Sequence, residues 1–186
     1  RHFGIGSDGM VFVENGLGGL KWDFYNTDGS YAEMCGNATR CMGRWAALEM
    51  HQDAVTFDTL VGQVTASVSG PHISSRLDFV SAQPREIPFS TNGVSYRVHL
   101  VNTGVPHFVV DVAKLEAAQK MNDVIASLRF HPEAGERGAN VTFLEHLGPR
   151  SFRTVTFERG VEGFTLSCGT GVLAAAAGGL KGSADL

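Results

Sequence analysis

Two short stretches with the same layout, far apart in the chain, constrain its fold most strongly. Residues 32–41 and 165–171 each place a cysteine before a glycine, then a small polar residue, then a run of helical character. The polar residue is Asn in the first stretch and Thr in the second, and such side chains can cap backbone N–H groups at a helix start. We therefore expect Cys35 and Cys168 to lie at helix N-termini, where the partial positive charge favours a thiolate.

The similarity continues upstream of each cysteine. Phe24 and Phe157 each stand eleven positions before the cysteine, and Asn26 and Arg159 each stand nine positions before it. This repeated spacing indicates one ancestral unit used twice, which gives two similar halves that face each other. Two thiols presented by two mirrored halves would suit chemistry on both faces of one small molecule.

The apolar pattern between these motifs predicts short strands, few helices and glycine-rich connections. Besides a helix after each cysteine, residues 112–128 have helical spacing, whereas residues 83–88 contain two prolines and predict a break. Strands are predicted over residues 10–14, 20–26, 54–59, 62–68, 73–80, 94–101, 108–110, 141–145 and 152–158. The predicted fold is α+β with two pseudo-symmetric halves, 1–105 and 106–186, each a curled, barrel-like β-sheet around a central helix, and with the active site between the halves.

The composition and charge of the chain limit the classes of partner that it is expected to bind. The net charge of −4 gives no sign of nucleic-acid binding, and no apolar run reaches the roughly 18 residues that a membrane span needs. Three cysteines would leave one over in a disulfide framework, and their spacing fits no common zinc pattern. We therefore expect reduced thiols, no metal, no membrane and a cytoplasmic protein. The first and last residues read as the middle of a domain, so we also expect the chain to be incomplete at both ends.

Several motifs, taken in order along the chain, resemble the diaminopimelate epimerase family. They are Asn26–Ser30, Met34–Asn37 with Arg40 and Cys41, Gly104–His107, Arg137–Asn140, and Glu158–Glu162 leading to Ser167–Gly171. The resemblance implies a cofactor-independent isomerase that interconverts LL- and meso-2,6-diaminopimelate on the route to lysine and peptidoglycan. It implies that the partner is a small-molecule amino-acid substrate and that no nucleic acid takes part. It is also compatible with a homodimer.

The resemblance also assigns roles to the matching positions. Cys35 and Cys168 would be the acid and base thiols, and His107 and Glu158 would assist them. Cys41 is expected to be a small buried apolar residue. A two-base reaction needs a base on one face of the α-carbon and an acid on the other, without the electron sink that pyridoxal phosphate supplies elsewhere. Substrate contacts would come from Asn26, Gly36, Asn37, Asn140, Glu158, Arg159, Gly169 and Thr170.

Two departures from the family pattern and two other functions stay open. Val105 stands where many members have Asn, and Ala38 stands where many have Asn or Gly. A proline or hydroxyproline racemase of the same fold is the nearest alternative, although those proteins tend to carry His where Asn37 stands. A redox-sensing or binding module with a cysteine pair is the alternative outside enzymes. His107 and Glu158 argue against that alternative, because a sensor does not need them.

Overall fold

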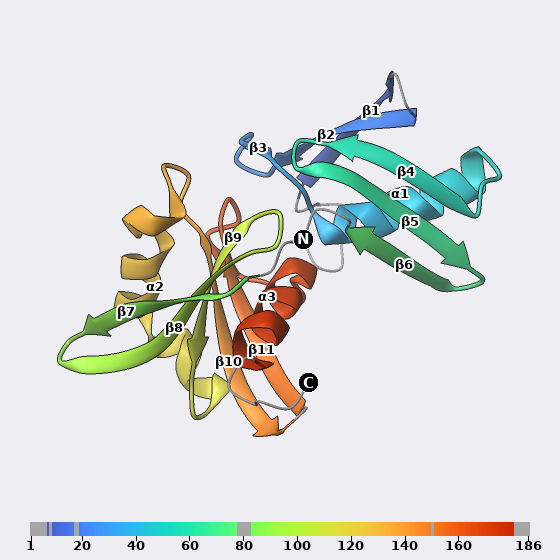
Figure 1. Cartoon of the computed structure of the whole chain (residues 1–186). Helices are drawn as coiled ribbons and strands as arrows, with labels where there is room; N and C mark the ends of the chain where they lie inside the picture. Colours follow the sequence, from blue (N-terminus) through green and yellow to red (C-terminus); the bar gives the residue numbers. More distant parts are fainter. Residues whose placement is uncertain (1–6, 8, 17–18, 78–82, 150, 181–186) are drawn as a thin grey trace. The chain divides into compact units, whose positions relative to one another are not determined.

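The computed structural model describes residues 7, 9–16, 19–77, 83–149 and 151–180. By its internal contacts the chain divides into two units, residues 1–80 and 81–186, and each is described by itself (Figure 1). This division lies earlier in the chain than the predicted boundary between residues 105 and 106. The reason is that the strands within residues 85–102 pair with the second sheet.

The described residues of the first unit form a six-stranded sheet and the helix α1. Its strands run in the order β1–β2–β4–β5–β6, and the two-residue β3 pairs with β2. Only β2 and β4 are parallel among these described pairs; the others are antiparallel. The elements are β1 (Gly9–Gly16), β2 (Gly19–Asn26), β3 (Tyr31–Ala32), α1 (Gly36–Glu49), β4 (Ala54–Thr59), β5 (Gly62–Ser69) and β6 (His72–Leu77).

Helix α1 packs on this sheet through a narrow apolar face. Ala38, Met42 and Ala46 recur at every fourth position and are buried, as expected for the inner face of an amphipathic helix. They belong to one core with Trp22 and Phe57, whose rings stack with their centroids 5.8 Å apart. This core fixes the helix, and with it the segment that leads into the helix.

The second unit is also built on a six-stranded sheet, in the order β12–β11–β10–β9–β8–β7. Within it β9 and β10 are parallel and the other described neighbours are antiparallel. The strands are β7 (Arg85–Thr91), β8 (Val94–Asn102), β9 (Pro106–Asp111), β10 (Asn140–Gly148), β11 (Ser151–Glu158) and β12 (Gly163–Phe164). The helical segments are η1 (Leu115–Lys120), α2 (Asn122–Arg129) and η2 (Pro132–Ala134) between β9 and β10, and α3 (Gly169–Leu180) after β12.

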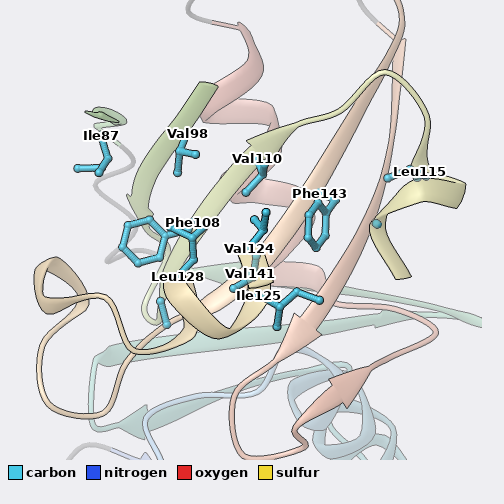
Figure 2. Close-up of a cluster of buried hydrophobic side chains, with 12 residues drawn as sticks. Ile87, Val98, Phe108, Val110, Leu115, Val124, Ile125, Leu128, Val141 and Phe143 are labelled. Carbon is cyan, nitrogen blue, oxygen red and sulfur yellow. The ribbon is translucent and has the colours of Figure 1, made fainter. Parts of the chain in front are cut away.

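The second sheet carries helices on both of its faces. On one face α2 packs through Val124 and Leu128 against Phe108 of the sheet (Figure 2). On the other face the alanines of α3 meet Val109 and Leu144. Because successive strand residues point to opposite faces, every second residue counted from Val109 or Leu144 lies on the α3 side. The predicted site residues of β9 and β10 have this parity.

The predicted break over residues 83–88 is wrong, because β7 begins at Arg85 and runs through Pro88. A proline is tolerated there because β7 is the last strand of the described sheet, where one side of the strand makes no ladder hydrogen bonds. Asn92 and Gly93, with φ of 51° and 74°, join β7 to β8 in a two-residue hairpin. Asn-Gly is the strongest short sequence signal for such a turn.

The helix predicted over residues 112–128 is interrupted. It consists of the 3₁₀ segment η1 and of α2, separated at Met121, whose ψ of 47° is outside the helical region. Both segments still face the same core, so the apolar spacing detected the burial but not the break. The strand predicted over residues 73–80 is described as far as Leu77, and its last three residues lie outside the described residues.

Candidate active site

Both repeat cysteines follow the same order of elements. In the first unit the β1–β2 hairpin leads into a turn, the short strand β3, then Cys35 and α1. In the second unit the β10–β11 hairpin leads into a turn, the short strand β12, then Cys168 and α3. The aromatic residues of the repeat, Phe24 and Phe157, pair with β3 and β12 respectively. The repeat predicted from spacing is therefore confirmed in the fold.

Cys35 occupies the N-cap position of α1, with extended backbone at φ −140° and ψ 115°. Its carbonyl accepts hydrogen bonds from the backbone N–H of Thr39 (3.0 Å) and from Thr39 Oγ1 (3.1 Å). The side-chain oxygen of Asn37 accepts a hydrogen bond from Arg40 Nη2. The cysteine itself, and not Asn37, is thus the residue at the cap, which confirms the predicted place of the thiol.

Cys168 holds the equivalent position before α3. This helix begins at Gly169, and the Val172 N–H donates to the Cys168 carbonyl at 3.0 Å. Both Cys35 and Cys168 are half-buried. The first N–H groups of an α-helix have no carbonyl partner within the helix, so each helix start can bind an anion such as a carboxylate beside its thiol.

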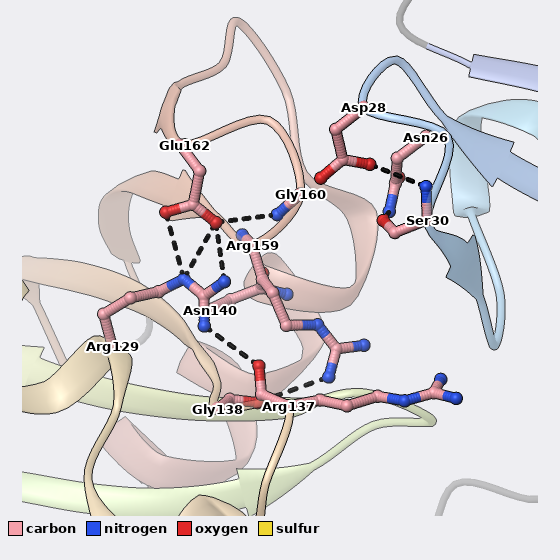
Figure 3. Close-up of polar contacts among 10 residues, drawn as sticks. All are labelled: Asn26, Asp28, Ser30, Arg129, Arg137, Gly138, Asn140, Arg159, Gly160 and Glu162. Carbon is pink, nitrogen blue, oxygen red and sulfur yellow. Dashed lines mark hydrogen bonds and ion pairs between the residues drawn. The ribbon is translucent and has the colours of Figure 1, made fainter.

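Asn26 ends β2 and holds the turn that leads to β3. Its Nδ2 donates to Ser30 Oγ at 3.0 Å, and its backbone N–H donates to the Ser30 carbonyl at 2.9 Å (Figure 3). Asp28 Oδ1 accepts the Ser30 N–H at 2.8 Å. Hydrogen bonds from the Ser30 side chain and backbone lower the pKa of Asp28. The turn therefore gives the predicted substrate residue Asn26 a fixed position in the first unit.

Four predicted site residues of the second unit meet on the α3 side of its sheet. His107 on β9 is fully buried. Its Nδ1 lies 2.9 Å from Thr142 Oγ1, and its Nε2 lies 3.1 Å from Thr170 Oγ1 and 3.2 Å from Asn140 Nδ2. Thr170 Oγ1 in turn lies 3.4 Å from Cys168 Sγ. One hydroxyl group therefore connects the buried imidazole to the thiol.

The imidazole of His107 is held in its neutral form. Burial, with a smaller contribution from the positive charge of Arg159, lowers the pKa of His107 to about 3. A neutral imidazole has one N–H donor and one acceptor nitrogen, so the hydrogen-bond partners decide which nitrogen carries the proton. His107 therefore enters the site as a polar neutral group and not as a cation.

Glu158 and Arg159 lie where β11 ends and the turn to β12 begins. The backbone N–H of Arg159 donates to Asn140 Oδ1 at 2.7 Å, and its Nη1 donates to the Gly138 carbonyl at 3.3 Å (Figure 3). The carboxylate of Glu158 accepts a hydrogen bond from Thr165 Oγ1. Asn140 thus joins the buried histidine to the turn that carries the two charged residues.

Sequence reasoning missed two threonines of this network. Thr142 and Thr156 face each other on β10 and β11, with their Oγ1 atoms 3.1 Å apart. The start of α3 lies close over them: a Cβ on Gly171 would be 2.4 Å from Thr156 Oγ1 and 3.1 Å from Thr142 Oγ1. The available signal was the alternation in β10, where polar residues at Asn140 and Thr142 share one face of a buried strand.

Cys41 is exposed, so its predicted burial is wrong. It lies in α1 beside the apolar face that Ala38, Met42 and Ala46 form, and not within it. The preference of cysteine for the interior is a statistical one, and here the position on the helix decides.

In the part of the chain that the structure describes, His, Cys, Asp and Glu side chains form no group of three or more that could hold a metal ion. None of the helices among the described residues is long and apolar enough to cross a membrane.

Solved structures of other proteins share the fold. A hydroxyproline epimerase from Agrobacterium vitis, solved with bound trans-4-hydroxy-L-proline, matches with a TM-score of 0.68 at 17% identity, over 94% of this chain and 60% of that one. A PhzF-family phenazine biosynthesis protein from Enterococcus faecalis matches with a TM-score of 0.61 at 14% identity, over 94% of this chain and 67% of that one. These likenesses concern the fold alone, and they place the chain in a structural class of α+β proteins that includes epimerases.

Sequence comparison identifies the family within that class. The family model of diaminopimelate epimerase matches residues 1–76 and 99–184. The diaminopimelate epimerases of Aquifex aeolicus and Hydrogenobaculum sp. are 39% and 36% identical to the chain, over 94% and 92% of its length. The chain belongs to the diaminopimelate epimerase family. It spans 64% of the length of each of these two curated relatives.

Proposed function

We propose that the chain acts as a diaminopimelate epimerase, which interconverts LL- and meso-2,6-diaminopimelate by removing and replacing one α-proton. The observation that carries the proposal is the structural repeat: each unit places one cysteine at a helix start after the same hairpin, turn and two-residue strand. Membership of the family supports the substrate class.

The proposed reaction uses one thiolate and one thiol. Inversion of a carbon needs proton removal on one face and proton addition on the opposite face. In one direction the thiolate of one cysteine takes the α-proton while the thiol of the other gives its proton to the carbanion. In the other direction Cys35 and Cys168 exchange these roles. The proposal therefore requires that both units present their cysteines to one α-carbon.

The helix starts supply the electrostatic part of the proposal. First-turn N–H groups of α1 and α3, which begin at Gly36 and Gly169, would bind the substrate carboxylate beside the reacting carbon and stabilise the charge that develops there. This arrangement would replace the electron sink of a cofactor, so we propose that the reaction uses none. Thiols that must stay reduced fit a cytoplasmic location.

The remaining residues would orient the substrate or assist the thiols. We assign Asn26, Asn37, Asn140 and Arg159 to polar groups of the substrate, since amides and a guanidinium match ammonium and carboxylate groups. Thr170 would contact the substrate from the first turn of α3. His107 and Glu158 would assist the thiols, and the buried position of His107 means that it acts through a neighbour.

Isotope exchange tests the proposal. In deuterium oxide the chain should convert LL-diaminopimelate to the meso form with deuterium at one α-carbon, as measured by chiral chromatography and mass spectrometry. Replacing Cys35→Ala or Cys168→Ala should lower the rate by about 10²–10⁴-fold, the usual contribution of a general acid or base. Cys41→Ala is the matched control and should keep most of the rate.

The same assay separates the alternatives. Circular dichroism must first show that all three variants are folded. Equal losses for Cys41→Ala and Cys168→Ala would show that the pair is misassigned. Turnover of trans-4-hydroxy-L-proline without turnover of diaminopimelate would replace the proposal with the hydroxyproline alternative.

A further inference from the structure

The hydrogen bonds around His107 define which of its nitrogens carries the proton. The Arg159 backbone N–H can only donate, and it points at Asn140 Oδ1 at 2.7 Å. The amide nitrogen of Asn140 is therefore the group that faces His107 Nε2 at 3.2 Å, and it donates. Nε2 must then be the acceptor, so the proton is on Nδ1 and is donated to Thr142 Oγ1.

The Thr170 hydroxyl lies between this acceptor nitrogen and the thiol. Its Oγ1 is 3.1 Å from His107 Nε2 and 3.4 Å from Cys168 Sγ. A hydroxyl has one proton to donate and two lone pairs to accept with, and it rotates to suit its neighbours. It can donate in only one of the two directions at a time, so the protonation state of Cys168 decides which direction is favoured.

We propose that the Thr170 hydroxyl is a two-way hydrogen-bond switch for Cys168, with His107 as its fixed second partner. When Cys168 is a thiol, its S–H donates to Thr170 Oγ1 and the hydroxyl donates to Nε2. When Cys168 is a thiolate, the hydroxyl turns and donates to the sulfur. No proton passes between the three residues in this rotation. The proton that leaves Cys168 goes to the substrate carbanion or to solvent.

A second donor to His107 Nε2, the amide nitrogen of Asn140, lowers the free-energy cost of rotating the Thr170 hydroxyl. A buried nitrogen that loses its only partner would incur a desolvation penalty. Here the Thr170 hydroxyl and Asn140 Nδ2 share the one lone pair of Nε2 when Cys168 is a thiol, and Asn140 Nδ2 keeps it after the hydroxyl has turned away. Thr170 itself is held by more than its hydroxyl, because its carbonyl accepts from Thr103 Oγ1 at 3.2 Å. Only the hydroxyl proton needs to move.

The titratable groups around the switch come from three parts of the second unit. Cys168 precedes α3, His107 lies on β9, and Glu158 and Arg159 lie at the end of β11. The positive charge of Arg159 lies close enough to His107 to lower the pKa of the imidazole. Because His107 is neutral above about pH 3, its charge does not change over the pH range in which the Cys168 thiol is titrated.

The switch would serve a residue that must act as both acid and base. Its use in catalysis rests on the proposed function, in which Cys168 is a thiol in one direction and a thiolate in the other. A permanent donor would favour the thiolate alone, and a permanent acceptor would favour the thiol alone. A hydroxyl that reverses its direction can stabilise each form in turn.

Alkylation of Cys168 without substrate tests the switch. The folded chain is treated with iodoacetamide between pH 6 and 10, and the modified Cys168 peptide is quantified by mass spectrometry. Thr170→Val keeps the shape of the side chain and removes the hydroxyl. The bond lost by the thiolate is charge-assisted and stronger than the one lost by the thiol, whose S–H is a weak donor, so the alkylation midpoint should rise by about one pH unit. Thr170→Ser should keep the wild-type midpoint.

A matched control and a second readout make the test decisive. Thr56→Val removes a hydroxyl that contacts Thr65 on an exposed part of the first sheet, and it should leave the Cys168 midpoint unchanged.

In the unmutated chain, ¹⁵N spectra of His107 should show a proton on Nδ1, and the Nε2 resonance should move in step with the titration of Cys168. A proton on Nε2, a stationary Nε2 resonance or an unchanged midpoint in Thr170→Val would overturn the switch. Because no substrate is present, such a failure is distinct from a failure of the epimerase assay.

Discussion

His107 shows how the surroundings of one residue change its chemistry. Its sequence neighbours indicate a functional histidine, and a histidine normally titrates near neutral pH. The fold instead buries it between Thr142, Asn140 and Thr170, which supply polar partners that favour the neutral ring. The family resemblance named His107, Asn140 and Thr170 as site residues, but no pattern in the sequence shows that they contact one another or Thr142, because the four residues lie on β9, β10 and α3, which meet only in the folded unit.

The buried histidine should make the stability of the chain depend on pH. The pKa of His107 is about 3 in the folded state and near 6.5 in the unfolded state, so the unfolded chain takes up a proton first as the pH falls. Stability from this residue is complete above pH 6.5 and is lost below it. Between pH 6.5 and 5 the loss should be about 2 kcal/mol. Urea unfolding at several pH values measures it.

A His107→Gln variant isolates this contribution from those of the other histidines. Gln keeps a donor and an acceptor but has no proton to gain. The variant should therefore lose less stability than the wild type between pH 6.5 and 5, whatever its absolute stability. Parallel pH profiles for the two proteins would show that the ring is already able to protonate in the folded state.

At the scale of elements, one ion pair holds the two segments that carry Asn140 and Arg159. Arg129, buried at the end of α2, bonds Glu162 through Nε and Nη2 (2.6 Å for Nη2), and its Nη1 donates to the Arg137 carbonyl at 3.0 Å (Figure 3). Glu162 adopts a left-handed backbone (φ 50°) and accepts the Gly160 N–H at 3.0 Å. The guanidinium thus ties the segment before β10 to the turn after β11.

Removing the carboxylate should loosen both segments. Glu162→Ala leaves the buried Arg129 guanidinium without its charged partner, and we expect a loss of about 2 kcal/mol, below the usual 3–5 because Glu162 is half exposed. The matched control is Glu133→Ala, which breaks the exposed pair with Arg85 and should cost less than about 1 kcal/mol. Chemical denaturation measures both values. Equal losses would mean that the pair with Arg129 is an ordinary surface contact.

The sequence predicted elements better than it predicted their interruptions. Apolar runs and alternation located most strands, both those with one buried face, such as β5, and those buried on both faces, such as β10. The break at Met121 was not predictable from spacing, because η1 and α2 bury residues in the same core. The β7 strand was missed for a different reason: the two prolines of residues 83–88 predicted a break, and the Asn92-Gly93 turn signal that follows the strand was not considered. The pairing of Thr142 with Thr156 depends on strand register, which a local pattern does not specify.

At the scale of the whole molecule, the repeat was the most informative feature of the sequence. The aromatic residue stands eleven positions before the cysteine in both units, although the elements between the two residues differ slightly in position. The strand β3 ends three residues before Cys35, whereas β12 ends four residues before Cys168. The division of the chain was harder to predict, because β7 and β8 join the second sheet by pairing with β9. The repeat defines the two segments that carry Cys35 and Cys168, and strand pairing defines the two units.

The two-thiol proposal makes a prediction that involves both units at once. If Cys35 and Cys168 act on opposite faces of one carbon, a modest approach in the absence of substrate should bring their Cα atoms within about 7 Å, the limit for a disulfide. Oxidation by diamide, which takes up the two electrons and two protons of the thiols, should then link Cys35 to Cys168 and stop epimerisation. Peptide mapping by mass spectrometry identifies the link, and dithiothreitol should restore the activity.

Two observations decide whether a disulfide between Cys35 and Cys168 reflects a shared substrate site: protection by bound substrate, and the identity of the cysteines that become linked. Bound diaminopimelate should slow the reaction with diamide, because it would stand between the two sulfurs. Cys41→Ser, which removes the exposed cysteine of α1, should leave both the link and its effect on activity unchanged. A crosslink mainly between Cys35 and Cys41, or an inactivation that dithiothreitol does not reverse, would contradict the idea that the two repeat cysteines share one substrate. Such a result would leave the repeat as a feature of the fold and would require a different acid for one of the two proton transfers.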